Sequence, residues 1–120
     1  MVRFGLIGAV MLSVISLAPE AWAASPYDGY WSVVIQTLRG ACEPAYRSAV
    51  FIRNGVVSGG DGVAQLYGRV NRRGRVSVVV RSGTQTARGT GRLGRRSGGG
   101  SWSGVGTAGR CSGRWAASQR

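Results

Sequence analysis

The sequence contains no histidine, the side chain that most often serves as a general base near neutral pH. Catalytic triads built on histidine and metal sites built on imidazole are therefore excluded. Carboxylates are also scarce, since the chain has only Glu20, Asp28, Glu43 and Asp61. Nothing in their spacing suggests the facing pair of acids that a glycosidase requires. We therefore expect a protein that is not an enzyme and that holds no metal and no cofactor.

Lysine is absent as well, so all sixteen basic residues are arginine, and the formal net charge is +12. An excess of positive charge of this size attracts polyanions. The guanidinium group presents a planar fork of donors that matches phosphate and carboxylate groups. The composition therefore predicts an anionic partner, such as lipopolysaccharide, acidic polysaccharide or an anionic lipid surface.

The N-terminal apolar run is too short to cross a bilayer, which takes about 20 residues. This run, residues 4–17, carries no charge, follows Arg3 and precedes Ala21-Trp22-Ala23. A basic start, an apolar stretch and a small-x-small site are typical of a secretory signal peptide. We expect a signal peptide over residues 1–23, cleaved after Ala23, and a single domain over residues 24–120. The domain would be periplasmic or secreted, with no transmembrane segment after cleavage.

Cysteine is limited to two residues, Cys42 and Cys111. An exported protein meets an oxidising environment, in which disulfides persist. The sequence therefore predicts one Cys42–Cys111 disulfide, and two free buried thiols are the alternative. Closing a loop of this length stabilises a fold by roughly 4 kcal/mol in the chain-entropy model. Such a cross-link would help a domain that is too small to bury a large core.

No helical period of useful length is found, and apolar residues instead alternate with polar ones between turn signals such as Asn54-Gly55 and Asn71-Arg72-Arg73-Gly74. This pattern predicts an all-β fold, a small antiparallel up-and-down barrel or a strongly curved meander of about eight strands. A two-sheet β-sandwich is the alternative. Glycine-rich turns or loops are expected at 59–62 and 94–100. The expected strands are 29–38, 46–53, 56–58, 63–70, 75–81, 86–93, one from Ser101, and 110–116.

The alternation assigns large aromatic residues to the inside of the sheet and arginines to the outside. The predicted core aromatics are Trp31, Trp102 and Trp115, and Cys111 shares their side. Neighbouring strands lie about 4.8 Å apart, so outward arginines would form a band suited to phosphate or carboxylate groups. The alternative is that they only keep the sheet soluble and block edge pairing. The candidate anion-binding residues are Arg69, Arg75, Arg81, Arg88, Arg92 and Arg114.

The segment over residues 88–104 mixes arginine and glycine in the manner of disordered segments that bind RNA. Thr86, Arg88, Thr90 and Arg92 nevertheless alternate with small or apolar residues, which predicts a strand, a loop and a second strand. Export and the small number of exposed aromatic rings for stacking on bases disfavour nucleic acid as a partner.

Four short motifs can be taken together: Asp28-Gly-Tyr-Trp-Ser-Val33, Cys42 with Ala45-Tyr-Arg47, Arg53-Asn-Gly55, and Cys111-Ser-Gly-Arg-Trp115. They resemble a group of small, mostly uncharacterised exported proteins of proteobacteria, over nearly all of residues 24–120. The Gly-x-Trp opening of the first strand is also similar to lipocalin- and avidin-like barrels. The resemblance implies a β-domain whose glycines and tryptophans mark the fold, and it assigns no activity to any residue.

These observations favour an exported, non-enzymatic β-module that binds anionic envelope or extracellular polymers through its arginine face. One alternative is a proteinaceous inhibitor of an exported hydrolase, acting through a loop that protrudes at 59–62 or 94–100. Another is a carrier of a small hydrophobic ligand, with a cavity among the three tryptophans. The sequence specifies neither the ligand nor an oligomeric state.

Overall fold

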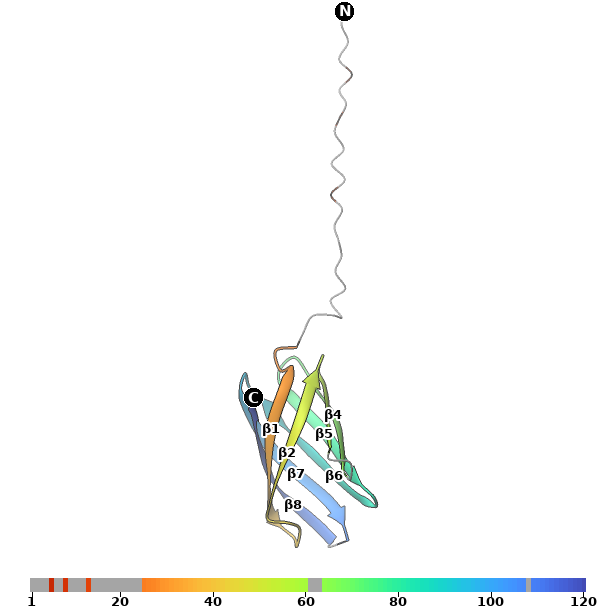
Figure 1. The fold of residues 1–120 in the computed structure, drawn as a ribbon, viewed down its shortest axis with the longest axis vertical. Helices are drawn as coiled ribbons and strands as arrows, with labels where there is room; N and C mark the ends of the chain where they lie inside the picture. The colour runs from red at the N-terminus through yellow and green to blue at the C-terminus, as the bar shows by residue number, and fades with distance from the viewer. Residues whose placement is uncertain (1–4, 6–7, 9–12, 14–24, 61–63, 108) are drawn as a thin grey trace, which may run out of the picture.

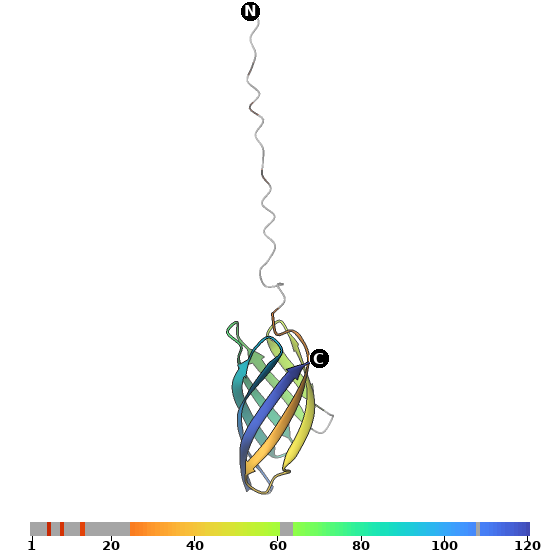
Figure 2. The ribbon, with the colours of Figure 1, turned by 90° about the vertical axis from the view of Figure 1, so that its left-hand side faces the viewer.

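Eight antiparallel strands close into a barrel (Figures 1 and 2). The structure is a computed structural model and describes residues 5, 8, 13, 25–60, 64–107 and 109–120. Each strand pairs with the one that follows it, and β8 pairs back onto β1. The predicted up-and-down barrel is confirmed, and the two-sheet sandwich is excluded because a hydrogen-bonded ladder joins the first and last strands. The strands are β1 (Gly29–Arg39), β2 (Ala45–Arg53), β3 (Val56–Gly60), β4 (Gln65–Val70), β5 (Arg75–Ser82), β6 (Gln85–Leu93), β7 (Ser97–Gly106) and β8 (Gly109–Gln119).

Turn residues set where the strands reverse. The β2–β3 turn is Asn54-Gly55, where both residues have positive φ, 51° and 78°, as a two-residue hairpin requires. In the β4–β5 turn, Asn71 Oδ1 accepts hydrogen bonds from the backbone N–H groups of Arg73 (3.0 Å) and Arg75 (2.9 Å). Gly74 completes this turn with a φ of 83°. Both turns were identifiable in the sequence because their chemistry is local.

Strand β7 begins earlier than the sequence predicts. The pattern indicates a loop over residues 94–100, whereas β7 starts at Ser97 and the turn is confined to residues 94–96. Gly98 pairs with Leu93 of β6, and a Cβ on Gly98 would lie 2.6 Å from Leu93 Cδ2. Glycine is therefore needed here for close packing within a strand and not for a flexible loop. The loop prediction is wrong. The long loop at 94–100 that the inhibitor alternative required is mostly part of β7 instead.

The predicted glycine turn at 59–62 is wrong for its first two residues. Gly59 and Gly60 belong to β3 and pair with Leu66 and Gln65 of β4. Residues 61–63 lie outside the described residues, and they include Asp61 and the first residue of the expected fourth strand.

One end of the barrel, the closed end, is covered by residues 25–28. Trp31 is fully buried there, and its indole Nε1–H donates to the Tyr27 carbonyl at 2.8 Å. The Tyr27 hydroxyl donates in turn to the Arg72 carbonyl at 3.4 Å, and Gln119 Nε2 donates to the Asp28 carbonyl at 2.9 Å. The lead-in segment thus bonds to β1, to the β4–β5 turn and to β8. The buried core lies below it and comprises Trp31, Val33, Val50, Ile52, Val57, Val70, Val76, Leu93 and Ala117.

The opposite end, the mouth, carries the disulfide. Cys42 lies in the β1–β2 loop and Cys111 is buried near the start of β8, with their Cα atoms 6.1 Å apart. The predicted cross-link is confirmed. It holds the β1–β2 loop against β8 so closely that a Cβ on Gly40 would lie 2.7 Å from Cys111 Sγ.

Candidate functional site

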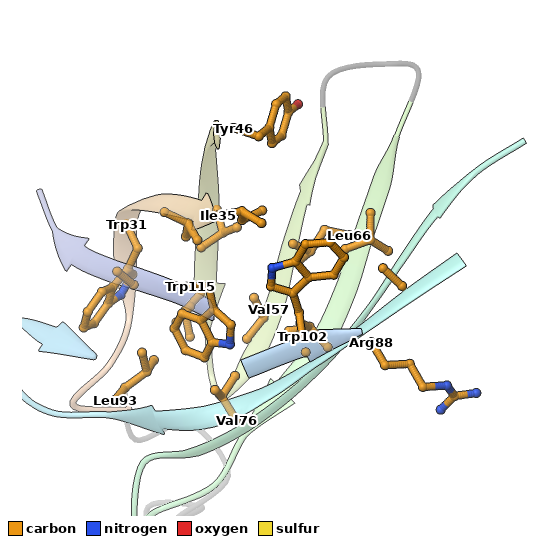
Figure 3. Close-up of a pocket in the computed structure, with 18 residues that line it drawn as sticks. Trp31, Ile35, Tyr46, Val57, Leu66, Val76, Arg88, Leu93, Trp102 and Trp115 are labelled. Atoms are coloured by element: carbon orange, nitrogen blue, oxygen red, sulfur yellow. The ribbon is translucent and has the colours of Figure 1, made fainter. Parts of the chain in front are cut away.

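The interior of the barrel holds a cavity of about 200 Å³, and most of the buried core residues line it (Figure 3). All eight strands contribute to its wall, and every strand except β3, β4 and β7 contributes at least two residues, because alternate side chains of each strand point inward. Arg88 borders the cavity only through its strand position, since its guanidinium points away from the interior (Figure 3). The other lining residues are Trp31, Val33, Ile35, Tyr46, Val50, Ile52, Val57, Leu66, Val76, Val78, Val80, Ala87, Gly89, Leu93, Trp102, Trp115 and Ala117.

The three predicted core tryptophans border this cavity and direct their polar atoms to the backbone. Trp115 Nε1–H donates to the Thr90 carbonyl of β6 at 3.1 Å, and Trp102 Nε1–H donates to the Gln36 carbonyl of β1 at 3.0 Å. Trp31 bonds to the lead-in segment in the same way. Because each indole N–H is already satisfied, the rings present only carbon to the cavity.

Inward glycines let these rings lie along the barrel wall. The Trp115 ring crosses from β8 to β6, and a Cβ on Gly91 would lie 2.6 Å from Trp115 Cζ2. The Trp102 ring crosses in the other direction, from β7 to β1, and a Cβ on Gly113 would lie 2.9 Å from Trp102 Nε1. The inward glycines therefore make room for the two rings, and the barrel still contains a cavity beside them.

The cavity extends toward the mouth. A smaller hollow of about 110 Å³ shares Val80, Ala87 and Trp102 with it and reaches Cys42 and Cys111. The disulfide therefore lies beside the path that leads out of the barrel. The contributions of Ile35, Leu66 and Ala87 to the wall were not singled out from the sequence, because alternation gives the face of a residue but not its depth in a barrel.

The six arginines predicted to bind anions are all exposed and lie on the outer faces of β4, β5, β6 and β8. They are spread along the barrel. Arg75 and Arg92 occupy directly opposite positions near the closed end, whereas Arg81 lies near the mouth. Arg69 pairs with Ser77 and Arg114 pairs with Ser101.

Arg88 has a different setting, on a shallow outer hollow of about 500 Å³ near the mouth. The hollow follows a row of paired positions: Arg88 of β6 opposite Ser103, Ser103 opposite Ser112, and Ser112 opposite Arg39 of β1. Arg110 also lines it. The sequence did not single out Arg39 or Arg110 as site residues, because their proximity to Arg88 depends on strand pairing: Arg110 reaches it across β7, and Arg39 reaches it only through closure of β8 onto β1.

Within the described ranges, no group of three or more His, Cys, Asp and Glu side chains is placed to hold a metal ion. The part of the chain that the structure describes also contains no helix with the length and apolar character needed to cross a membrane.

Comparison with protein-family models, with curated proteins and with solved structures finds no match to this chain. The resemblance to small exported proteobacterial proteins stays a prediction, as does the similarity to lipocalin- and avidin-like barrels. A function for the chain is therefore argued from its geometry.

Proposed function

We propose that the protein binds a small apolar ligand inside the barrel. The observation that carries this proposal is the cavity of about 200 Å³, whose wall is made of aliphatic and aromatic side chains. An apolar cavity of about 150 Å³ in another protein stays free of water and accepts benzene. A cavity somewhat larger than that suits a rigid, uncharged molecule of roughly two fused rings.

The same wall selects against charged ligands. All three indole N–H groups are bonded to backbone carbonyls, so the cavity offers no free indole donor to a carboxylate or phosphate. Moving an ion into such surroundings without a partner has a large desolvation cost. The +12 net charge of the chain acts outside the barrel and does not compensate for this cost within it.

The proposal describes binding and not catalysis, in keeping with the expectation from the sequence. Export is a further expectation, because residues 1–23 lie outside the described residues except for Gly5, Gly8 and Ser13. The disulfide is compatible with an oxidising compartment outside the cytoplasm.

Titration of the protein with naphthalene, followed by tryptophan fluorescence and calorimetry, tests the proposal. Naphthalene should bind with one site per chain and should perturb the tryptophan emission. Naphthalene-2-carboxylate has the same rings with one added charge, and we expect it to bind at least about 100-fold more weakly because its carboxylate would be buried unpaired.

A matched pair of variants locates the site. Ala87→Leu adds three carbons on the cavity wall, and Ala116→Leu adds the same three carbons on the exposed face of β8. Naphthalene binding should fall at least about ten-fold in Ala87→Leu and stay unchanged in Ala116→Leu. Absence of binding to the wild-type protein, or equal losses in the two variants, would overturn the proposal.

A further inference from the structure

Arginines gather around the closed end of the barrel, away from the mouth. Three structural units contribute: the end of β2, the β4–β5 turn with the start of β5, and the end of β6 with the β6–β7 turn. All seven side chains are exposed. We call this group the basic cap, and it comprises Arg53, Arg72, Arg73, Arg75, Arg92, Arg95 and Arg96.

Little negative charge opposes the basic cap. Asp28 is the one acidic side chain near this end in the described residues, since Glu43 lies in the β1–β2 loop at the mouth. The Asp28 carboxylate is turned inward: its Oδ2 accepts a hydrogen bond from the Ser25 backbone N–H at 3.3 Å, and its Oδ1 is buried without a partner. It is therefore not paired with any cap arginine, and the cap faces solvent with an uncompensated positive charge.

The placement of the basic cap suits a planar partner. The strand ends and turns that carry these arginines lie together at one end of the barrel, so a flat surface can contact all of them at once. A linear polymer would instead follow a groove. A barrel strand of 11 residues, such as β1, is roughly 36 Å long and spans roughly 28 Å of the barrel axis at a tilt of about 40°. The Debye length at physiological salt is about 8 Å, so arginines at the mouth are screened from a surface that touches the cap.

We propose that the basic cap docks the barrel end-on against an anionic phospholipid surface. Each guanidinium donates its forked hydrogen bonds to lipid phosphate groups, and an arginine near such a surface raises the affinity by roughly five-fold. The mouth then faces away from the lipid, with the disulfide on the side of the aqueous phase. This docking is independent of the apolar ligand, because the cap shares no side chain with the cavity wall.

Vesicle sedimentation with two charge-matched variants tests the docking. The cap variant combines Arg72→Glu, Arg73→Glu, Arg95→Glu and Arg96→Glu. The mouth variant combines Arg39→Glu, Arg81→Glu, Arg88→Glu and Arg110→Glu, and its net charge is identical. All eight positions are exposed, and none of the eight side chains takes part in a hydrogen bond or ion pair between described residues.

Vesicles of equal parts phosphatidylcholine and phosphatidylglycerol should bind the wild-type protein, and vesicles of phosphatidylcholine alone should not. The cap variant should lose affinity on the order of a thousand-fold, and the mouth variant should lose less than about ten-fold. Near-ultraviolet circular dichroism checks that both variants fold. If an Arg→Glu variant does not fold, the same four positions are changed to glutamine in both variants.

Equal losses in the two variants would mean that only net charge matters, and the inference would fail. A larger loss in the mouth variant would place binding at the outer hollow near Arg39 and Arg110 instead. Soluble polyphosphate separates the sources of phosphate: retention on polyphosphate without vesicle binding would also overturn docking on lipid. Naphthalene binding is measured in parallel, so that failure of the docking and failure of the cavity proposal remain distinguishable.

Discussion

At the scale of single residues, the barrel depends on glycines that lie beneath tryptophan rings. Gly113 of β8 is the clearest case, because a Cβ there would overlap the Gln36 carbonyl oxygen and would lie 2.9 Å from Trp102 Nε1. Both atoms belong to one hydrogen bond, the one from the Trp102 indole to Gln36. The missing side chain of Gly113 is therefore part of the structure that shapes the cavity wall.

We predict that Gly113→Ala destabilises the fold by about 3 kcal/mol or more, since a rigid backbone oxygen cannot move aside as a flexible side chain can. Urea unfolding measures the change. Gly94→Ala is the control, because this glycine is exposed, lies in a turn without positive φ, and a Cβ there would meet only the Ser97 carbonyl oxygen, at 3.2 Å; it should change stability by no more than about 1 kcal/mol. A similar stability for the two variants would contradict this account of Gly113.

At the scale of elements, the β5–β6 ladder places two like charges directly across from each other. Arg75 is opposite Arg92, whereas Arg88, four residues away on β6, is opposite Val79. Like charges at directly opposed positions of a sheet are destabilising, by amounts comparable to the 0.2–1 kcal/mol that favourable cross-strand pairs contribute. The Arg75–Arg92 pair thus makes a small unfavourable contribution to the folding free energy at the closed end. Such a contribution is consistent with a surface that serves binding more than stability.

Arg92→Glu should stabilise the protein by about 0.5 kcal/mol, because it replaces the repulsion at Arg75 with an attraction. The gain should shrink in high salt, where exposed charges are screened. Arg88→Glu lowers the net charge equally without a charged cross-strand partner, and it should give a smaller gain in the same thermal unfolding experiment. An equal gain in both variants would assign the effect to net charge.

At the scale of the whole molecule, the chain is closed in two ways. Hydrogen bonds join β1 to β8, and the Cys42–Cys111 disulfide links the β1–β2 loop to β8 across 69 positions of sequence. Both connections join the beginning of the barrel to its end. The cross-link lowers the conformational entropy of the unfolded chain, and it also holds the β1–β2 loop beside the mouth.

Replacing both cysteines with alanine should lower the free energy of unfolding by roughly 4 kcal/mol in the chain-entropy model. Chemical denaturation of the double variant, beside the wild-type protein with and without reductant, measures this loss. The reduced wild-type protein should match the double variant. A loss below about 1 kcal/mol would show that the β1–β8 ladder closes the barrel without help.

The sequence by itself determined the strand faces, two of the turns and the disulfide. These features have local causes: the period of two that separates Val76 and Val78 from Ser77, the φ preferences of Asn54-Gly55, and the presence of a single cysteine pair. The start of β7 was not predictable in this way, because glycine is typical of loops and of closely packed strands alike. Only the neighbouring Leu93 side chain distinguishes the two.

The tertiary structure alone decided which residues come together. Closure of β8 onto β1 brings Arg39 beside Arg110, and the level of each residue along the barrel separates the basic cap from the mouth. The directions of the Trp102 and Trp115 rings leave a cavity inside the barrel. The alternating sequence pattern was equally compatible with a filled core. Alternation specifies the side of a strand on which a residue lies, whereas depth and neighbours depend on strand register, which long-range pairing sets.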